Sequence, residues 1–290
     1  AYGATEQEDL AAFADFGLEP TPAPMPHVNP NRFWLEGYGA YRQEENDRLG
    51  ADFDHTGGGL TVGFDMPYDA TTSIGVMAGF AIVDSDNEIN TQDMASTAFY
   101  GGVYASTLAM GLAWDASLTV GHLSTDYRRV VANNLVTDGL EVAKGELDGW
   151  FFTPQLTVSH DGDMIESALT LRYTGLFYDG DTETGVASPL TVGSNAIHLA
   201  TARAQFALPY EMIGADGSLT TLRAYAGVEG RLNFGDDTID ATLLGKRVTA
   251  SPEEDDAIAG AFIGASLDYE TATGFTAFAR GEAMIETDSS

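Results

Sequence analysis

The sequence contains no cysteine, few basic residues and no long hydrophobic run, and each shortage excludes a class of protein. Without cysteine there is no disulfide scaffold, no thiolate zinc site and no cysteine nucleophile. The 13 Lys and Arg residues stand against 44 Asp and Glu residues, for a formal net charge of −31. This charge excludes nucleic-acid binding, which depends on basic side chains that release counterions. No stretch approaches about 18 consecutive apolar residues, so no membrane-spanning helix is expected.

What the chain has in quantity is glycine and aromatic side chains. The 33 glycines, 15 Phe and 12 Tyr accompany a hydrophobic content of 44%, which is ordinary for a folded protein and excludes a disordered acidic tail. Glycine and aromatic residues are enriched together in β-barrels, where strands bend and rings gather at the rims. The composition therefore favours an all-β fold.

The first 31 residues differ from the rest and form a separate segment. Residues 5–17 predict a short helix, with a capping box formed by Thr5 and Glu8 and with Gly17 at its end. A helix of this length needs a surface to pack on. A proline-rich, extended spacer follows it up to Pro30. The segment is either a fraying helix on a linker or a plug threaded through the domain that follows. Its apolar stripe consists of Leu10, Phe13 and Phe16, and its acidic residues are Glu6, Glu8, Asp9 and Asp15.

From Arg32 onward polar and apolar residues alternate with a period of two, which predicts antiparallel strands. Short turns and long acidic loops alternate between consecutive strands, as in outer-membrane β-barrels, whereas soluble sandwiches show no such regularity. The long loops are expected at residues 44–56, 84–91, 125–145, 179–193 and 234–256. The strands are expected near residues 32–43, 57–68, 71–83, 92–106, 109–124, 146–160, 163–178, 194–209, 217–233, 257–270 and 273–286.

The two faces of the expected strands differ in charge. In residues 217–233 one face carries Arg223, Glu229 and Arg231, while the other face has only small and uncharged residues. This pattern indicates apolar residues toward lipid and charged residues toward a lumen, where ion pairing must offset the cost of desolvation. The predicted lumen-lining charge network consists of Glu36, Arg42, Glu166, Arg172, Arg203, Arg223, Glu229, Arg231, Arg280 and Glu282.

Short glycine-rich motifs recur in a fixed order along these strands. Residues 33–39 read Phe-Trp-Leu-Glu-Gly-Tyr-Gly, and residues 57–65 read Gly-Gly-Gly-Leu-Thr-Val-Gly-Phe-Asp. Residues 274–282, near the end, read Gly-Phe-Thr-Ala-Phe-Ala-Arg-Gly-Glu. The series resembles the translocator (β-barrel) domain of autotransporters, the type V secreted proteins of Gram-negative bacteria. Further motifs that fit it lie at residues 75–80, 100–105, 171–174 and 181–185.

The resemblance implies a 12-stranded transmembrane antiparallel β-barrel in the bacterial outer membrane, surrounded by its lipid. It implies that the N-terminal helix threads the lumen, contacts the lumen charges and links the barrel to an upstream passenger at the cell surface. It also implies insertion by barrel-assembly and periplasmic chaperone machinery. The expected function is therefore a translocator or anchor for an N-terminal passenger, with residues 1–31 as lumen helix and linker and residues 32–290 as barrel. Two alternatives stay open: a free-standing small porin or adhesin barrel, and a soluble acidic β-sandwich that acts as a binding module.

The strand count differs from the family pattern. The expected strands number eleven, and the last residues, Asp288-Ser289-Ser290, supply neither a closing strand nor a terminal aromatic residue. An odd count leaves two unpaired edges in lipid. We therefore expect that a closing strand is missing from this chain or lies within residues 238–250. The Asn-Asn pair with which some members cleave themselves is also absent from the junction, where Asn29-Pro30-Asn31 stands.

No catalytic residue, metal site or cofactor is expected. The best candidate for acid–base chemistry is His55 beside Asp52 and Asp54, and we expect it to sit in a solvated loop. The acidic stretches at residues 84–88 and 179–183 lack the glycine and glutamate positions of an EF-hand loop. They are either solvated loops or weak sites for divalent cations.

Overall fold

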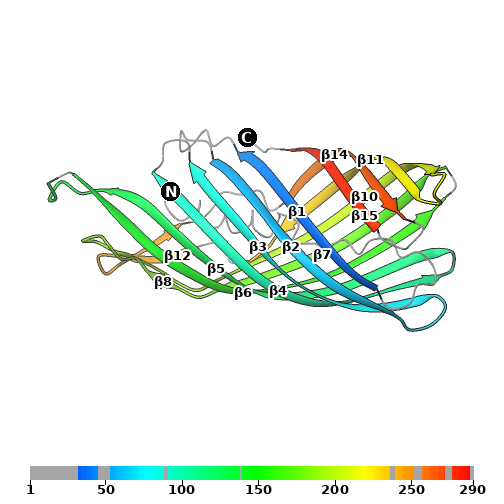
Figure 1. Cartoon of the computed structure of the whole chain (residues 1–290). Helices are drawn as coiled ribbons and strands as arrows, with labels where there is room; N and C mark the ends of the chain where they lie inside the picture. Colours follow the sequence, from blue (N-terminus) through cyan, green and yellow to red (C-terminus); the bar gives the residue numbers. More distant parts are fainter. Residues whose placement is uncertain are drawn as a thin grey trace.

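A computed structural model describes residues 32–44, 53–87, 91–137, 139–162, 164–235, 239–250, 257–271 and 276–287. These residues form one large antiparallel sheet of eleven strands, which curls on itself (Figure 1). Each strand pairs with the strand before it and the strand after it in the sheet. The predicted helix at residues 5–17 lies outside the described residues. The sheet consists of β1 (Arg32–Glu44), β2 (Phe53–Pro67), β3 (Thr72–Asn87), β4 (Gln92–Ala109), β5 (Leu112–Ala132), β6 (Leu140–Asp161), β7 (Glu166–Tyr178), β10 (Asn195–Ile213), β11 (Leu219–Asn233), β14 (Ala257–Glu270) and β15 (Thr276–Glu286).

The prediction of an all-β fold with eleven barrel strands is confirmed, but two of the expected long loops are wrong. Strand β3 continues to Asn87, and β5 and β6 together occupy most of residues 125–145. The alternation of period two persists in these stretches, with Tyr127 and Leu147 buried while Asp126 and Glu146 face solvent. Charged residues on the solvated face of a strand give a stretch the same composition as an acidic loop.

Connections of at most five residues join the strands at one end of the sheet, here called the inner end, and the longest connections lie at the opposite, outer end. The tightest inner turn joins β4 to β5 through Met110 and Gly111, whose φ angles are 57° and 76°. Strand β1 begins at the inner end, where Arg32 pairs with Asp65 just before the turn to β3.

A second, four-stranded sheet lies beyond the outer ends of β7, β10 and β11. It has the order β13-β12-β9-β8, with β8 (Asp181–Thr182), β9 (Leu190–Val192), β12 (Ile239–Leu243) and β13 (Lys246–Ala250). Lys144 of β6 and Thr184 exchange backbone hydrogen bonds of 3.0 and 2.8 Å, which attach this sheet to the barrel wall. The idea of a closing barrel strand within residues 238–250 is wrong, because β12 and β13 form a hairpin of the second sheet with a turn at Leu244 and Gly245.

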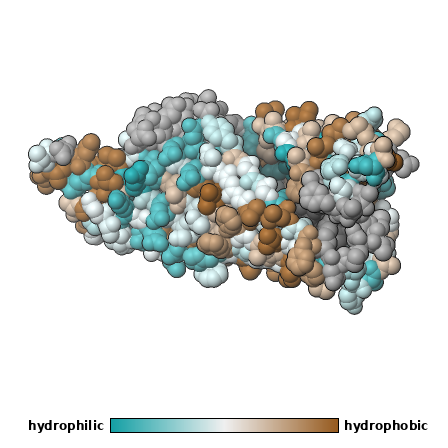
Figure 2. Space-filling model, viewed as in Figure 1, coloured by the Kyte–Doolittle hydropathy of each residue, from teal (hydrophilic) through white to brown (hydrophobic). Residues whose placement is uncertain are grey.

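The outer face of the curled sheet is apolar and its inner face is packed. In β3, Val76, Phe80 and Ile82 are 41–51% exposed on the outer face, whereas Met77 and Val83 on the inner face are at most 6% exposed. Figure 2 shows apolar patches on the visible outer surface. Toward the outer end a continuous cluster of ring contacts covers the outer face of β6, β7 and β10. It consists of Phe152, Tyr173, Phe177, His198 and Phe234 and matches the aromatic girdle of outer-membrane barrels.

Aromatic rings on the inner face lie directly over glycines of the neighbouring strand. A Cβ atom at Gly63 would come within 3.0 Å of the Trp34 ring, and one at Gly75 would meet the Tyr104 ring in the same way. Tyr104 and Trp34 also hydrogen-bond each other, with 2.7 Å between Trp34 Nε1 and the Tyr104 hydroxyl. The glycines of the strands are therefore sites that accept a ring, which accounts for the joint enrichment of glycine and aromatic residues.

Strands β1 and β15 are the two edges of the sheet formed by the described residues. Both run from the inner end to the outer end, so they are parallel and cannot pair with each other in an antiparallel barrel. One strand running inward between them would pair antiparallel with both. An even number of strands is thus what this topology requires for closure.

Replacing Gly63 by alanine should destabilise the barrel by about 1–3 kcal/mol, the usual cost of overpacking, because the added methyl group meets the Trp34 ring. Urea unfolding in detergent micelles, followed by loss of the fast-migrating band on an unboiled gel, measures the change. Gly230→Ala is the matched control, since a Cβ there meets no atom within 4 Å. Equal stability of the two variants would contradict the packing of rings on glycines.

Candidate functional site

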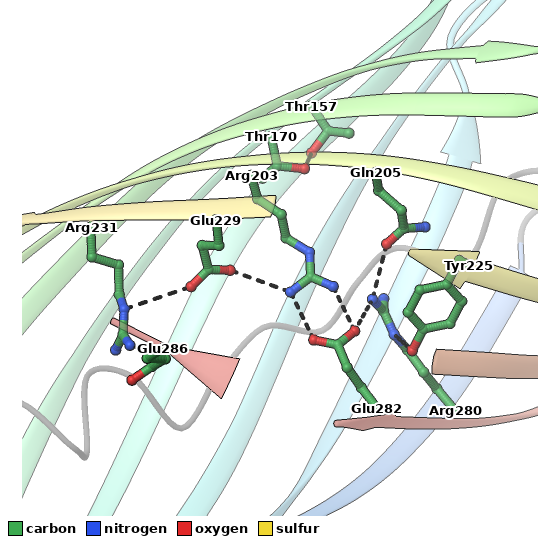
Figure 3. Close-up of polar contacts among 10 residues, drawn as sticks. All are labelled: Thr157, Thr170, Arg203, Gln205, Tyr225, Glu229, Arg231, Arg280, Glu282 and Glu286. Carbon is green, nitrogen blue, oxygen red and sulfur yellow. Dashed lines mark hydrogen bonds and ion pairs between the residues drawn. The ribbon is translucent and has the colours of Figure 1, made fainter. Parts of the chain in front are cut away.

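A row of six alternating charges crosses the inner face of β10, β11 and β15, and we call it the ionic ladder (Figure 3). Arg203 lies at its centre, with 3.3 Å between its Nη1 and Glu229 and 2.6 Å between its Nη2 and Glu282. Arg231 contacts Glu229 on one side and Glu286 on the other. In order, the ladder is Glu286, Arg231, Glu229, Arg203, Glu282 and Arg280.

Uncharged side chains hold the arginines of the ladder in place. The guanidinium of Arg203 stacks 3.5 Å above the centre of the Phe262 ring, and that of Arg280 lies 4.6 Å above the Tyr225 ring. Arg280 also donates to the Tyr225 hydroxyl at 2.8 Å and to Gln205 at 3.2 Å. Stacking on rings and hydrogen bonds to neutral groups reduce the cost of removing these cations from water.

The ladder is most buried at Arg231 and Glu229, next to its outermost residue Glu286. The side chains of Arg231 and Glu229 are only 8% and 7% exposed. Charges buried to this degree require partners, because an unpaired one would cost several kcal/mol. The alternation of sign supplies a partner on each side, so the wall tolerates six charges without a net charge.

A second charged cluster lies nearer the inner end. Arg223 of β11 donates from Nε to Glu166 of β7 at 2.7 Å and from Nη1 to Asp268 of β14. Among the described residues its Nη2 group has no hydrogen-bond partner, and the side chain is 22% exposed to the lumen. Arg223 therefore keeps donors that face the interior of the barrel.

The structure brings most of the predicted lumen network together, but not all of it. Arg172 faces the same lumen from β7, in register with Gln155 and Thr201. Glu36 is 8% exposed on the inner face of β1 and has no ion-pair partner among the described residues. The side chain of Arg42 and the acidic residues Glu6, Glu8, Asp9 and Asp15 lie outside what the structure describes. Glu166, Arg203, Arg223, Glu229, Arg231, Arg280 and Glu282 are in the ladder or in the Arg223 cluster.

Sequence reasoning missed two acidic partners, Asp268 and Glu286. The alternation of side chains along β14 and β15 places both residues on the charged face, so the sequence pattern is sufficient to identify them. Sequence reasoning also missed the ion pair between Arg129 and Glu183, at 2.6 Å, which joins β5 to the second sheet. The Glu183 side chain is fully buried there.

On the outer hairpin β12–β13, a hydrogen bond from Arg247 lowers the pKa of the Asp240 carboxyl.

The opposite wall of the lumen is apolar toward its outer end. Twelve buried side chains on the inner faces of β3 to β10 form one contact cluster, which we call the apolar wall. Leu123, Leu176 and Ile197 in this cluster are at most 2% exposed. The cluster consists of Ala81, Val83, Met94, Ala98, Tyr100, Leu123, Tyr127, Leu147, Phe151, Leu176, Tyr178 and Ile197.

Of the described histidines, His55 is the one that the sequence singled out. His55 is buried in β2, 2.7 Å from the Ser85 hydroxyl, so the expectation of a solvated loop is wrong. In the part of the chain that the structure describes, no group of three or more acidic or histidine side chains could hold a metal ion. Divalent-cation binding by the acidic loops stays a prediction. Within the described ranges no helix is long and apolar enough to cross a membrane.

Comparison with known proteins finds a matching family model and similar folds at low sequence identity. The family model of the autotransporter β-domain matches residues 33–282. The translocator domain of the autotransporter NalP from Neisseria meningitidis is 16% identical, with a TM-score of 0.61 over 99% of this chain and 96% of that chain. The β domain of the Bordetella autotransporter BrkA is 15% identical, with a TM-score of 0.62 over 89% and 93%. The transport unit of AIDA-I from Escherichia coli is 12% identical, with a TM-score of 0.51 over 99% and 98%. A search of curated protein sequences finds no match.

Glu282→Gln should lower the free energy of unfolding by about 1–3 kcal/mol, because it removes a charged acceptor from both Arg203 and Arg280 while keeping the shape of the side chain. Urea unfolding in detergent gives the value. The control is Asp240→Asn, which breaks an exposed ion pair with Arg247 and should leave stability unchanged. The ladder would not be a stabilising element if both substitutions had the same effect.

Proposed function

The chain belongs to the autotransporter β-domain family and is an outer-membrane translocator barrel, and we propose that it tethers an N-terminal passenger by a segment that runs through its lumen. In this proposal residues 1–31 are the lumen segment and linker, and the barrel begins at Arg32. The observation that carries it is the row of guanidinium groups on the inner wall. The acidic residues that would meet these groups are Glu6, Glu8, Asp9 and Asp15.

The direction of β1 supports this path. Because β1 starts at the inner end, the segment that precedes Arg32 must join it there. The outer face of the barrel carries apolar side chains suited to membrane lipid, so a polar segment cannot run along it. The lumen is the polar route from the inner end to the outer end.

The remaining donors of the arginines supply the binding chemistry. A guanidinium has five N–H groups, and Arg223 uses Nε and Nη1 for Glu166 and Asp268. A carboxylate of the segment can accept from Nη2 without displacing either wall acid. Contacts of this kind hold the segment by short-range pairing, because the ladder itself carries no net charge.

We also assign the insertion of the barrel to barrel-assembly and periplasmic chaperone machinery, on the basis of family membership alone. The chemistry that such partners recognise is an unpaired, amphipathic strand before the sheet is complete. A strand with one apolar and one charged face, as in β11, meets that description.

Reversing the charge of two arginines tests the lumen segment. The double variant Arg223→Glu with Arg231→Glu should release the acidic segment and raise single-channel conductance in planar bilayers, toward the level of protein that lacks residues 1–31. Arg247→Glu, an equal charge change on the exposed outer hairpin, is the control and should leave conductance unchanged.

Each variant must first show the heat-dependent gel shift of a folded barrel. If charge reversal prevents folding, the milder pair Arg223→Gln and Arg231→Gln takes its place. An unchanged current in the double variant, together with a raised current after deletion of residues 1–31, would contradict retention by charge.

A further inference from the structure

The two edge strands, β1 and β15, are attached to the sheet by more than backbone pairing. Among the described strands each has one neighbour in the sheet, β2 for β1 and β14 for β15. On the inner face of both edge strands, side chains also reach across two intervening strands to a third. The chemistry of these long-range contacts differs between the two edges.

The long-range contacts of β15 are ionic (Figure 3). Glu282 accepts hydrogen bonds of 2.9 and 2.6 Å from Arg203 of β10, across β11 and β14. Glu286 pairs with Arg231 of β11, across β14. Two carboxylates of the edge strand are therefore held by arginines of strands that are not its neighbours.

The apolar packing of β15 is sparse. Among its described side chains, Met284 is the one apolar group that packs on a buried cluster, which consists of three side chains of β10, β11 and β14. Phe278 is 44% exposed, and Ile285 on the outer face is 77% exposed. Beyond its pairing with β14, the attachment of this strand thus depends largely on the ladder.

The long-range contacts of β1 come from a neutral side chain. Trp34 donates from Nε1 to the Tyr104 hydroxyl of β4 at 2.7 Å, across β2 and β3. Both Trp34 and Tyr104 also donate to the buried Asp65 of β2. The Trp34 ring lies so close over Gly63 that no Cβ atom fits between them. Shape and hydrogen bonds therefore attach this edge.

Salt distinguishes the two kinds of attachment. Mobile ions weaken ion pairs that solvent can reach, and the side chains of Glu282 and Glu286 are 21% and 27% exposed. The packing of Trp34 on glycine is not screened in this way. Glu36, the single charged residue within residues 33–41, has no ion-pair partner among the described residues. Screening therefore acts on β15 and leaves β1 attached.

We propose that β15 is the releasable edge of this sheet and β1 its fixed edge, so that the barrel wall opens between β14 and β15 when the ion pairs of the ladder are lost. The pairs of Glu282 with Arg203 and of Glu286 with Arg231 act as a clasp on the edge strand. A strand that closes the barrel between β15 and β1 then meets one edge fixed by packing and one edge held by ions.

Hydrogen exchange of the full-length protein in detergent micelles, read by mass spectrometry, tests the difference between the edges. Raising NaCl from about 0.1 M to about 1 M shortens the Debye length from about 10 Å to about 3 Å. Exchange of the amides of residues 278–286 should become about tenfold faster, the effect of losing two partly exposed ion pairs. Residues 33–41 should exchange at an unchanged rate. Equal acceleration of both edges, or none at β15, would overturn the proposal.

Substitutions on the two edges assign the effect to its cause. Glu282→Gln with Glu286→Gln should raise β15 exchange at low salt to the high-salt rate and abolish its salt dependence. Trp34→Phe keeps a ring but removes the hydrogen bond to Tyr104, so it should speed exchange of β1 about fivefold at both salt concentrations and leave β15 unchanged. A salt response of β15 that persists in the double glutamine variant would reject the ionic clasp.

Each variant must first show the heat-dependent gel shift of a folded barrel, and amides in the centre of β5 must stay protected, which excludes global unfolding. If the double glutamine variant does not fold, Glu282→Gln alone takes its place and should halve the logarithm of the salt response. The comparison of the two edges in the unmodified protein decides the question in either case. Asp240→Asn, which breaks an exposed ion pair away from both edges, is the control and should alter neither.

The absence of native cysteine allows a second, independent measurement. Ala261 of β14 and Ile285 of β15 are directly opposite each other, as are Leu35 of β1 and Val62 of β2. A disulfide between Ala261→Cys and Ile285→Cys should remove the salt response of β15, and reduction should restore it. A disulfide between Leu35→Cys and Val62→Cys is the matched control and should leave that response intact. A response that survives the first disulfide would show that β15 does not separate from β14.

Discussion

Every backbone N–H and C=O group within a bilayer must find its partner inside the protein, because lipid offers none. A curled sheet of consecutive antiparallel strands meets this requirement, with β5 and β6 paired over 20 residue positions from Ala113 to Ala132. Once the sheet is curved, the pleat alone decides which side chains meet lipid and which meet the lumen. The apolar outer face, the packed rings and the charged wall all follow from that single geometric division.

The inner face solves two different packing problems. On β1 to β4 the rings of Trp34, Tyr100 and Tyr104 fill the space above glycines, so that wall is stabilised by close contact. On β10 to β15 the wall carries charges, and there each cation of the ladder has an anion on its own strand or on another strand of the wall. The first solution depends on shape and fails when a methyl group is added. The second depends on pairing and fails when one partner loses its charge.

Much of this could be predicted from the sequence, because a period of two is easy to see in long strands. Residues 217–233 assign Arg223, Glu229 and Arg231 to one face without any coordinates. What the sequence could not supply was the register between strands, which decides that Arg203 lies between Glu229 and Glu282. It also could not distinguish a solvated strand from a loop, so the outward continuation of β5 and β6 and the attached second sheet were missed. Acidic residues such as Asp126 and Glu146 are compatible with either structure.

The strict alternation of sign along the ladder determines how far its influence extends. The electric field of a row of alternating charges fades over roughly the spacing between neighbours, well within the Debye length of about 8 Å at physiological salt. The ladder by itself therefore neither attracts nor repels a polypeptide on the lumen axis at a distance. Only a side chain in direct contact with the wall can pair with one arginine rather than with its acidic neighbour. The ladder therefore does not oppose the passage of a polypeptide through the lumen, but it can bind a segment that stops in contact with it.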